Sequence, residues 1–214
     1  QAARGRTNDT LVFLDSHGRT YNTPAHSLPS ARSQGEPLTG RFKPKDGARF
    51  VGVVMGDSAT KVLLASNAGF GFIGPLADMV TKNKAGKACL SVSAGAEALP
   101  PIVISAATLE SGDGLVAAVT NQGRLLIFRL ADLPELSRGK GNKLINIPGA
   151  AFKAGEEAML AVAVLGAGDD LVVHAGQRHL TMKRKDYDNY IGERARRGGK
   201  LPRGFQKVDR LTVG

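Results

Sequence analysis

The sequence has a single cysteine and no tryptophan, and only 5% of its 214 residues are aromatic. A lone cysteine, Cys89, excludes an internal disulfide and fits a reducing compartment. It lies in the apolar run from Ala88 to Val92, which favours a buried, unreactive thiol over a nucleophile. No apolar run approaches the length that spans a bilayer, and the N-terminal residues QAARGRTND do not resemble a signal peptide. We therefore expect a soluble, cytoplasmic protein with no membrane partner.

Acidic residues are also scarce relative to basic ones. The chain has 19 Asp and Glu against 29 Lys and Arg, which gives a formal net charge of +10. A folded intracellular protein with this imbalance most often meets a polyanion, and nucleic acid is the commonest one. The alternative is a basic surface that is merely solvated. Apolar residues make up 42% of the chain, which is enough to build a core.

A recurring pattern dominates the rest of the sequence. Segments that read strand, tight turn, strand begin at Leu11, Lys61, Leu115 and Leu171, with turn glycines at Gly18, Gly69, Gly123 and Gly176. A second glycine follows each turn, at Gly35, Gly86, Gly141 and Gly199. Between the two glycines, Leu76–Met79 is echoed by Leu130–Leu133. A recurrence of about 50 residues with several strands per unit indicates blades, none of which buries its apolar face alone.

The repeat predicts one all-β domain over residues 1–214, a propeller-like disc with about four repeats. The expected units are residues 1–49, 50–99, 100–154 and 155–214. Within the second unit, the apolar runs Phe50–Met55 and Lys61–Ala65 flank Gly56-Asp57-Ser58, which predicts a hairpin. By the same logic, runs 102–105 and 115–119 open the third unit, and runs 159–165 and 171–174 open the fourth.

Three short motifs imitate chemical sites. Asp15-Ser16-His17-Gly18 contains triad residue types, but adjacent residues cannot assemble a triad, so we predict a turn. Gly69–Gly74 matches G-x-G-x-x-G, yet Pro75 follows where a helix would have to begin, so we predict a turn and a strand. Asp186 and Asp188 lack a third ligand. We therefore assign no catalytic residues and no metal ligands.

Basic residues gather around the second glycine of each unit. They are Arg32 in the first unit, Lys82, Lys84 and Lys87 in the second, Arg138, Lys140 and Lys143 in the third, and Arg194, Arg196, Arg197, Lys200 and Arg203 in the fourth. Arg4, Arg6, Arg19 and Arg124 are further candidates. In a radial arrangement, equivalent loops lie at equivalent places on the rim, which predicts a curved row of cations.

Such a row suits the phosphate backbone of duplex DNA. Glycine lets the chain approach phosphates, while Lys and Arg neutralise them and release counterions. Few aromatic residues are available to stack on unpaired bases, which favours duplex over single-stranded DNA. Nothing resembles a recognition helix, so we expect weak readout of base sequence and a protein that responds to the bending of the duplex. Because loop charges contribute little to stability, replacing Arg196, Arg197 and Lys200 is expected to leave the fold intact.

Three segments carry a resemblance to a known family: LPSARSQGEPLTG, SRGKGNKLINIP and GERARRGGKLPRGFQKVDR. The chain resembles, over essentially its whole length, the C-terminal domain of the bacterial topoisomerase IV A subunit, within the gyrase A C-terminal domain family. The resemblance implies a β-pinwheel, a disc of four-stranded blades that exchange strands. It also implies that the basic residues named above contact duplex DNA and bend it without catalysis.

The resemblance implies an assembly as well. Such a domain positions DNA for strand passage, decatenation and supercoil relaxation in an ATP-dependent type IIA topoisomerase whose catalytic tyrosine lies outside this sequence. Its partners would be the N-terminal part of the same polypeptide, the ATPase subunit of a heterotetramer, and a chromosome-organising protein. The protein would be associated with the nucleoid. The domain itself would hold no cofactor, whereas the holoenzyme would use ATP and Mg²⁺.

Two alternatives stay open beside this interpretation. The gyrase branch carries a QRRGGKG box in its first blade and wraps DNA tightly, whereas the nearest string here is ARRGGKL at residues 195–201, in the last repeat. This position favours milder bending over a gyrase-type wrap. The other alternative is a propeller-like platform whose basic rim binds an acidic protein. An enzyme built on blades ranks below both, because no nucleophile, base or metal set converges.

Overall fold

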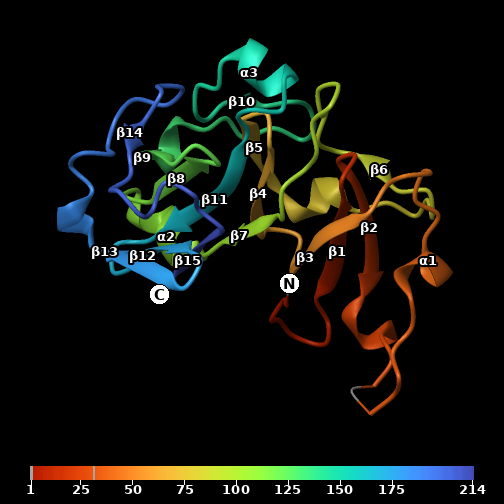
Figure 1. Ribbon diagram of the computed structural model, residues 1–214. Coiled ribbons are helices and arrows are strands. Elements are labelled where there is room, and N and C mark those ends of the chain that lie inside the picture. Colours follow the sequence, from red (N-terminus) through yellow and green to blue (C-terminus); the bar gives the residue numbers. More distant parts are fainter. Residues whose placement is uncertain (1, 31) are drawn as a thin grey trace.

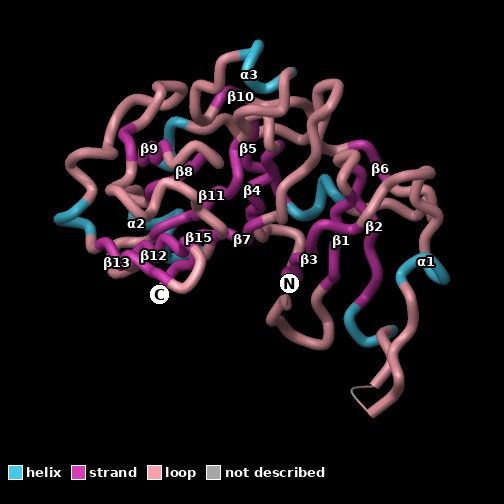
Figure 2. The backbone as a smooth tube through the Cα atoms, viewed as in Figure 1, coloured by secondary structure: helices cyan, strands magenta, loops and turns pink. Residues whose placement is uncertain are grey.

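The computed structural model describes residues 2–30 and 32–214, and its strands form four antiparallel sheets (Figures 1 and 2). The first sheet has the order β3 (Phe50–Gly56), β1 (Thr10–Asp15), β2 (Arg19–Pro24), β6 (Lys87–Ala88). The second has the order β7 (Ile102–Ile104), β4 (Lys61–Ser66), β5 (Phe70–Pro75), β10 (Asn142–Lys143). The third has the order β11 (Met159–Leu165), β8 (Leu115–Thr120), β9 (Arg124–Arg129), β14 (Gly199–Lys200). The fourth has the order β15 (Arg210–Val213), β12 (Leu171–Ala175), β13 (Arg178–Met182).

Helices are short and lie between the strands. The α-helices are α1 (Leu38–Arg41), α2 (Ala106–Ser111) and α3 (Gly149–Lys153). A 3₁₀ helix follows the second strand of every hairpin: η1 (Ala25–Ser27), η2 (Leu76–Met79), η3 (Leu130–Asp132) and η4 (Arg184–Asp186). The echoed Leu-Ala-Asp segments are therefore 3₁₀ turns at the same place in successive units, and the prediction of an all-β blade repeat is confirmed.

The hairpins form where the repeat predicted them, since β1–β2, β4–β5, β8–β9 and β12–β13 are all antiparallel pairs. The φ angle of Gly18 is +83°, a conformation that a side chain disfavours. Asp15 Oδ1 accepts hydrogen bonds from the backbone N–H groups of His17 and Arg19, both at 2.9 Å. Asp15 Oδ2 accepts a third from the buried Tyr21 hydroxyl at 2.7 Å. Asp15 therefore organises a turn, as predicted, and Gly69–Gly74 continues into strand β5 as predicted.

The predicted hairpin of Phe50–Met55 with Lys61–Ala65 is wrong. Strand β3 pairs with β1 in the first sheet, whereas β4 pairs with β5 and β7 in the second. Likewise β7 and β11 close the sheets that precede the hairpins β8–β9 and β12–β13. The segment at residues 56–60 therefore connects neighbouring sheets, since β3 completes the first sheet and β4 begins the second.

The outer strand of each of the first three sheets comes from the following unit. Strands β6, β10 and β14 pair with β2, β5 and β9, which belong to the preceding hairpins. On the opposite edge, β3, β7, β11 and β15 approach one another in sequence. In Figure 1, strands β3, β7, β11 and β15 lie toward the centre of the molecule. The exchanged strands β14, β10 and β6 lie along its upper edge. The strand-exchanging pinwheel implied by the resemblance is thus present.

Apolar clusters fill the space between consecutive sheets. One cluster joins the first and second sheets, another the second and third, and another the third and fourth. In strand β8 the residues alternate between two of these clusters, so all six are buried. A strand covered on both faces reads as a continuous apolar run, which explains LVAAVT at residues 115–120. A further aromatic cluster of Phe13, Tyr21, Phe42 and Phe50 fills the first sheet's outer side.

Cys89 is 1% exposed and packs between the first two sheets, as the sequence predicted. Burial raises the pKa of its thiol above the ordinary value of 9.0. Because the thiolate is the reactive form, we expect a thiol reagent at neutral pH to modify the native protein slowly and the urea-unfolded protein within the mixing time. Modification at equal rates in both states would show that the thiol is accessible in the native fold.

Candidate nucleic-acid interface

Three basic loops precede or include the exchanged outer strands, and we call them the rim loops: residues 81–87, 137–143 and 193–200. Each begins after the 3₁₀ helix of its own unit and crosses to the outer edge of the sheet before it. Because sheet order places β6, β10 and β14 at the same edge, the rim loops occupy equivalent places along one margin of the molecule (Figure 1). The predicted row of basic loops is therefore present for the second, third and fourth units, but the described part of the loop with Arg32 in the first unit adds no strand to a sheet.

A left-handed glycine marks each rim loop. Gly86, Gly141 and Gly198 have φ angles of +75°, +76° and +76°. The equivalent of Gly86 in the last unit is thus Gly198, one residue before the glycine that the sequence alignment selected. Gly35, in the first unit, has the same geometry at +74°, but no described atom lies within 4 Å of the Cβ it would carry. Among the described residues, the loop around Gly35 therefore joins no sheet.

Most of the predicted contact residues are exposed. This group comprises Arg4, Arg6, Arg32, Lys82, Lys84, Arg138, Lys140, Arg196, Lys200 and Arg203. Some of them already have intramolecular contacts. The Lys140 ammonium lies 3.9 Å from the centre of the Phe70 ring, and Arg196 forms an exposed ion pair with Glu193 at 2.8 Å. Exposed contacts of this kind are weak and exchange readily with a competing phosphate.

The remaining predicted residues are only half-exposed, and their side chains bond other groups of the protein, mostly backbone carbonyls. They are Arg19, Lys87, Arg124, Lys143, Arg194 and Arg197. Arg194, for example, donates hydrogen bonds from Nη1 to the Lys143 carbonyl at 2.6 Å and from Nε to the Asp132 carbonyl at 3.1 Å. The structure thus divides the sequence-predicted cations into an exposed set that faces solvent and a half-exposed set that is bonded within the protein, where Arg19, Arg124 and Arg194 join neighbouring units.

Arg197 is the most deeply engaged of these cations. Its two terminal nitrogens donate to the two carboxylate oxygens of Glu157, both at 2.7 Å, and Nη1 also donates to the Asn146 carbonyl at 3.0 Å. The Glu157 side chain is 5% exposed and that of Arg197 is 34% exposed. Burial alone would raise the pKa of the Glu157 carboxyl, but the hydrogen bonds and charge of Arg197 hold it below its ordinary value of 4.5.

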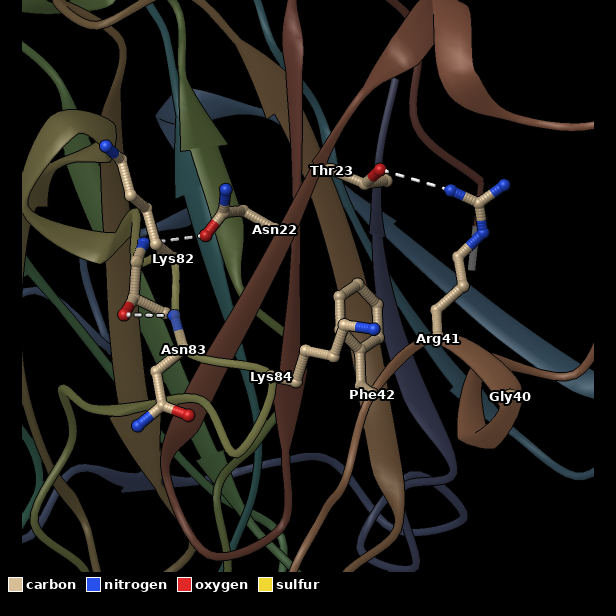
Figure 3. Close-up of a pocket in the computed structure, with 9 residues that line it drawn as sticks. Asn22, Thr23, Gly40, Arg41, Phe42, Lys82, Asn83 and Lys84 are labelled. Atoms are coloured by element: carbon tan, nitrogen blue, oxygen red, sulfur yellow. Dashed lines mark hydrogen bonds between the residues drawn. The ribbon is translucent and has the colours of Figure 1, made fainter.

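A hollow of about 550 Å³ opens beside the first rim loop (Figure 3). Lys82 and Lys84 reach it from the rim loop, and Arg41 reaches it from the end of α1. The Asn22 side chain lies on its wall and accepts a hydrogen bond from the backbone N–H of Thr81 at 2.7 Å. Sequence reasoning missed Arg41, whose part in this cationic hollow depends on a fold that brings residues 41 and 82 together.

No helix within the described part of the chain is long and apolar enough to cross a membrane. In residues 2–30 and 32–214, no group of three or more His, Cys, Asp or Glu side chains is placed to hold a metal ion.

The four sheets contact one another through their inner strands, and exchanged outer strands link the units. This arrangement defines a propeller-like domain with a basic margin. The family model described as DNA gyrase C-terminal domain, beta-propeller matches residues 9–54 and 114–158. The solved structure of the E. coli ParC C-terminal domain superposes with a TM-score of 0.85 at 40% identity, covering 98% of this chain and 83% of that one. The chain belongs to the family of C-terminal domains of the topoisomerase IV protein ParC, as its sequence indicated.

Longer relatives agree with this assignment. The A subunit of DNA topoisomerase 4 from Pseudomonas aeruginosa is 50% identical over 99% of this chain, and its Escherichia coli counterpart is 41% identical over the same share. The chain spans 28% and 27% of those two proteins, so it corresponds to about a quarter of their length. A gyrase A C-terminal domain with 13% identity and a TM-score of 0.74 shares the fold.

Proposed function

We propose that this domain binds duplex DNA along the margin formed by the rim loops and bends it, without catalysing a reaction itself. The observation that carries the proposal is the repetition of a cationic loop at the same outer edge of three consecutive sheets. Membership of the topoisomerase IV family supports DNA as the polyanion. The proposed contacts are the exposed cations of the rim loops. Arg4, Arg6, Arg32 and Arg203 lie outside these loops, and Arg4 lines a hollow with residues of β3 and β7 at the opposite edge of the sheets.

The geometry explains why the duplex backbone suits this margin. Exposed Lys and Arg side chains neutralise phosphates, and the contacts are independent of base sequence. A margin that follows a fan of sheets is curved, so a duplex that touches successive rim loops must bend toward the protein. Bending a short duplex costs on the order of 1–6 kcal/mol, which the additional phosphate contacts offset.

In the longer polypeptide, we propose that the domain presents a DNA segment for strand passage, decatenation and relaxation. ATP, Mg²⁺ and the catalytic tyrosine then belong to other parts of the topoisomerase. The proposed assembly partners are the N-terminal part of the same polypeptide and the ATPase subunit, and the nucleoid is the proposed location. The last-repeat position of ARRGGKL favours bending by this branch over a gyrase-type wrap.

Duplex binding and its dependence on salt test this function. We expect fluorescence anisotropy with a labelled duplex of mixed sequence to show binding that weakens about 10³-fold or more between 50 and 200 mM salt, if about six or more phosphates are contacted. Lys140→Glu should weaken binding to unrelated sequences equally. Lys153→Glu, an exposed lysine in α3 outside the rim loops, is the matched control and should change it less.

Two results would contradict the proposal. Binding that is insensitive to salt and to Lys140→Glu would exclude a phosphate-dominated interface. Absence of duplex binding together with capture of an acidic protein would favour the interaction platform instead.

A further inference from the structure

The arginine that follows the turn glycine occupies one equivalent position in two of the hairpins. Arg19 follows Gly18 in the first sheet, and Arg124 follows Gly123 in the third. Both are half-exposed, and both lie on the strand that receives the exchanged outer strand. Arg19 is opposite Ala88 of β6, and Arg124 is opposite Lys200 of β14.

Each of these arginines holds the left-handed end of the incoming rim loop. Arg19 donates from Nε to the Ala85 carbonyl at 2.9 Å and from Nη2 to the Gly86 carbonyl at 2.7 Å. Arg124 donates from Nη1 to the Gly198 carbonyl at 3.3 Å. Arg19 thus holds two successive carbonyls with the fork geometry that lysine lacks, whereas Arg124 makes a single bond. We call these two interactions the arginine clasps.

The middle junction uses different chemistry. Phe70 occupies the arginine position of the second sheet, opposite Lys143 of β10. Lys140 and Lys143 place their ammonium groups 3.9 and 5.8 Å from the centre of its ring. Here the cation comes from the incoming loop and faces the acceptor strand, so a phosphate can compete for it. The arginine clasps have no such competitor, because the arginine bonds backbone carbonyls and its charge is directed into the junction.

From this arrangement we propose that Arg19 and Arg124 are positioning residues, which fix the angle between neighbouring sheets and thereby set how far bound DNA is bent. The proposal rests on the proposed DNA-bending function. The exchanged strands β6 and β14 are two residues long, so their pairing alone restrains the rim loops weakly. Other contacts also hold these loops, among them those of Asn22 with Thr81 and of Arg194 with the Lys143 carbonyl. Loss of the clasps should therefore loosen the rim loops, so that their exposed cations meet phosphates at less fixed places along the arc.

The test separates bending from phosphate contact. On an end-labelled duplex of about 20 base pairs, energy transfer reports the bend, and the slope of log affinity against log salt reports the number of phosphates. For Arg19→Lys and Arg124→Lys combined, which keep both charges, we expect the bend to fall by about half, since two of three junctions loosen. The salt slope should stay unchanged. For Arg138→Ala, an exposed rim-loop residue, the slope should fall by about 0.9 with the bend kept.

Arg178 provides the matched control within the fold. It is the first residue of β13, as Arg19 is of β2 and Arg124 is of β9, but no exchanged strand pairs with β13 in the described part of the chain. Arg178→Lys should therefore leave the bend unchanged. Circular dichroism at the assay temperature confirms that each variant is folded, and the single Lys replacements are measured as milder variants.

Different results overturn different conclusions. If the unsubstituted domain bends DNA and the paired Lys variant bends it equally, the positioning role is wrong while the proposed function stands. If Arg19→Ala and Arg124→Ala each lower the salt slope by about one, these residues contact phosphate directly and the positioning role is again wrong. If the unsubstituted domain binds DNA without bending it, the bending function itself fails and the inference fails with it.

Discussion

Arg197→Ala is expected to destabilise the domain by about 3 kcal/mol. This is the lower end of the cost of breaking a buried ion pair, because the Arg197 side chain is about one-third exposed. Removing the guanidinium leaves the Glu157 carboxylate buried without its bidentate partner and frees the Asn146 carbonyl. Urea unfolding monitored by circular dichroism measures the change. This expectation differs from the one that sequence alone gives, where Arg197 is an exposed loop charge whose replacement leaves the fold intact.

Arg196→Ala is the matched control for that variant. Arg196 is adjacent in the chain, but its ion pair with Glu193 is 71% and 79% exposed, so its loss should change stability by less than about 0.5 kcal/mol. Equal effects of the two replacements would refute the role assigned to Arg197. A double variant, Arg197→Met with Glu157→Leu, should recover much of the lost stability because it removes both charges from the buried site.

The same ion pair predicts a pH dependence. Burial raises the pKa of Glu157, but Arg197 outweighs burial and holds it below 4.5 in the folded state. The contribution of the pair is therefore present above that value and is lost as the pH falls through the lower, folded-state pKa. Unfolding free energies measured from pH 6 downward should decline in the unsubstituted domain. The decline should be shallower in Glu157→Gln, which has no carboxyl to titrate at this site.

Gly141→Ala is expected to cost about 2–4 kcal/mol, in two parts. A side chain at a φ angle of +76° costs about 1 kcal/mol in any surroundings. The added Cβ would also lie 2.0 Å from the Gly71 carbonyl oxygen, so the exchanged strand β10 must move away from β5, and such overpacking typically costs about 1–3 kcal/mol. Thermal unfolding measures the sum.

Gly35→Ala isolates the first of these two parts. Gly35 has a φ angle of +74°, and no described atom lies within 4 Å of the Cβ it would carry. Its replacement should therefore cost about 1 kcal/mol and no more. If Gly35→Ala and Gly141→Ala are equally destabilising, backbone conformation explains both, and close approach of the exchanged strand contributes nothing measurable.

The turns could be predicted because their determinants are local. Asp15 bonds its own turn, and Gly18, Gly69 and Gly123 adopt positive φ angles that the sequence pattern required. The hairpins, the 3₁₀ segments and the buried Cys89 followed from the same short-range rules. Strand pairing between units was predicted less well, as residues 50–55 show, because an apolar run does not specify which of two neighbouring hairpins it will complete.

The sequence by itself determined the repeat, the blade class, the net charge and the family. Only the tertiary structure decided which cations face solvent and which are bonded to other groups of the protein. Arg196 and Arg197 are adjacent and chemically identical, yet one lies on the margin and the other is paired with Glu157, 40 residues away in sequence. The physical reason is that the environment of a charge depends on the chain segments that folding brings beside it, and those segments are distant in sequence.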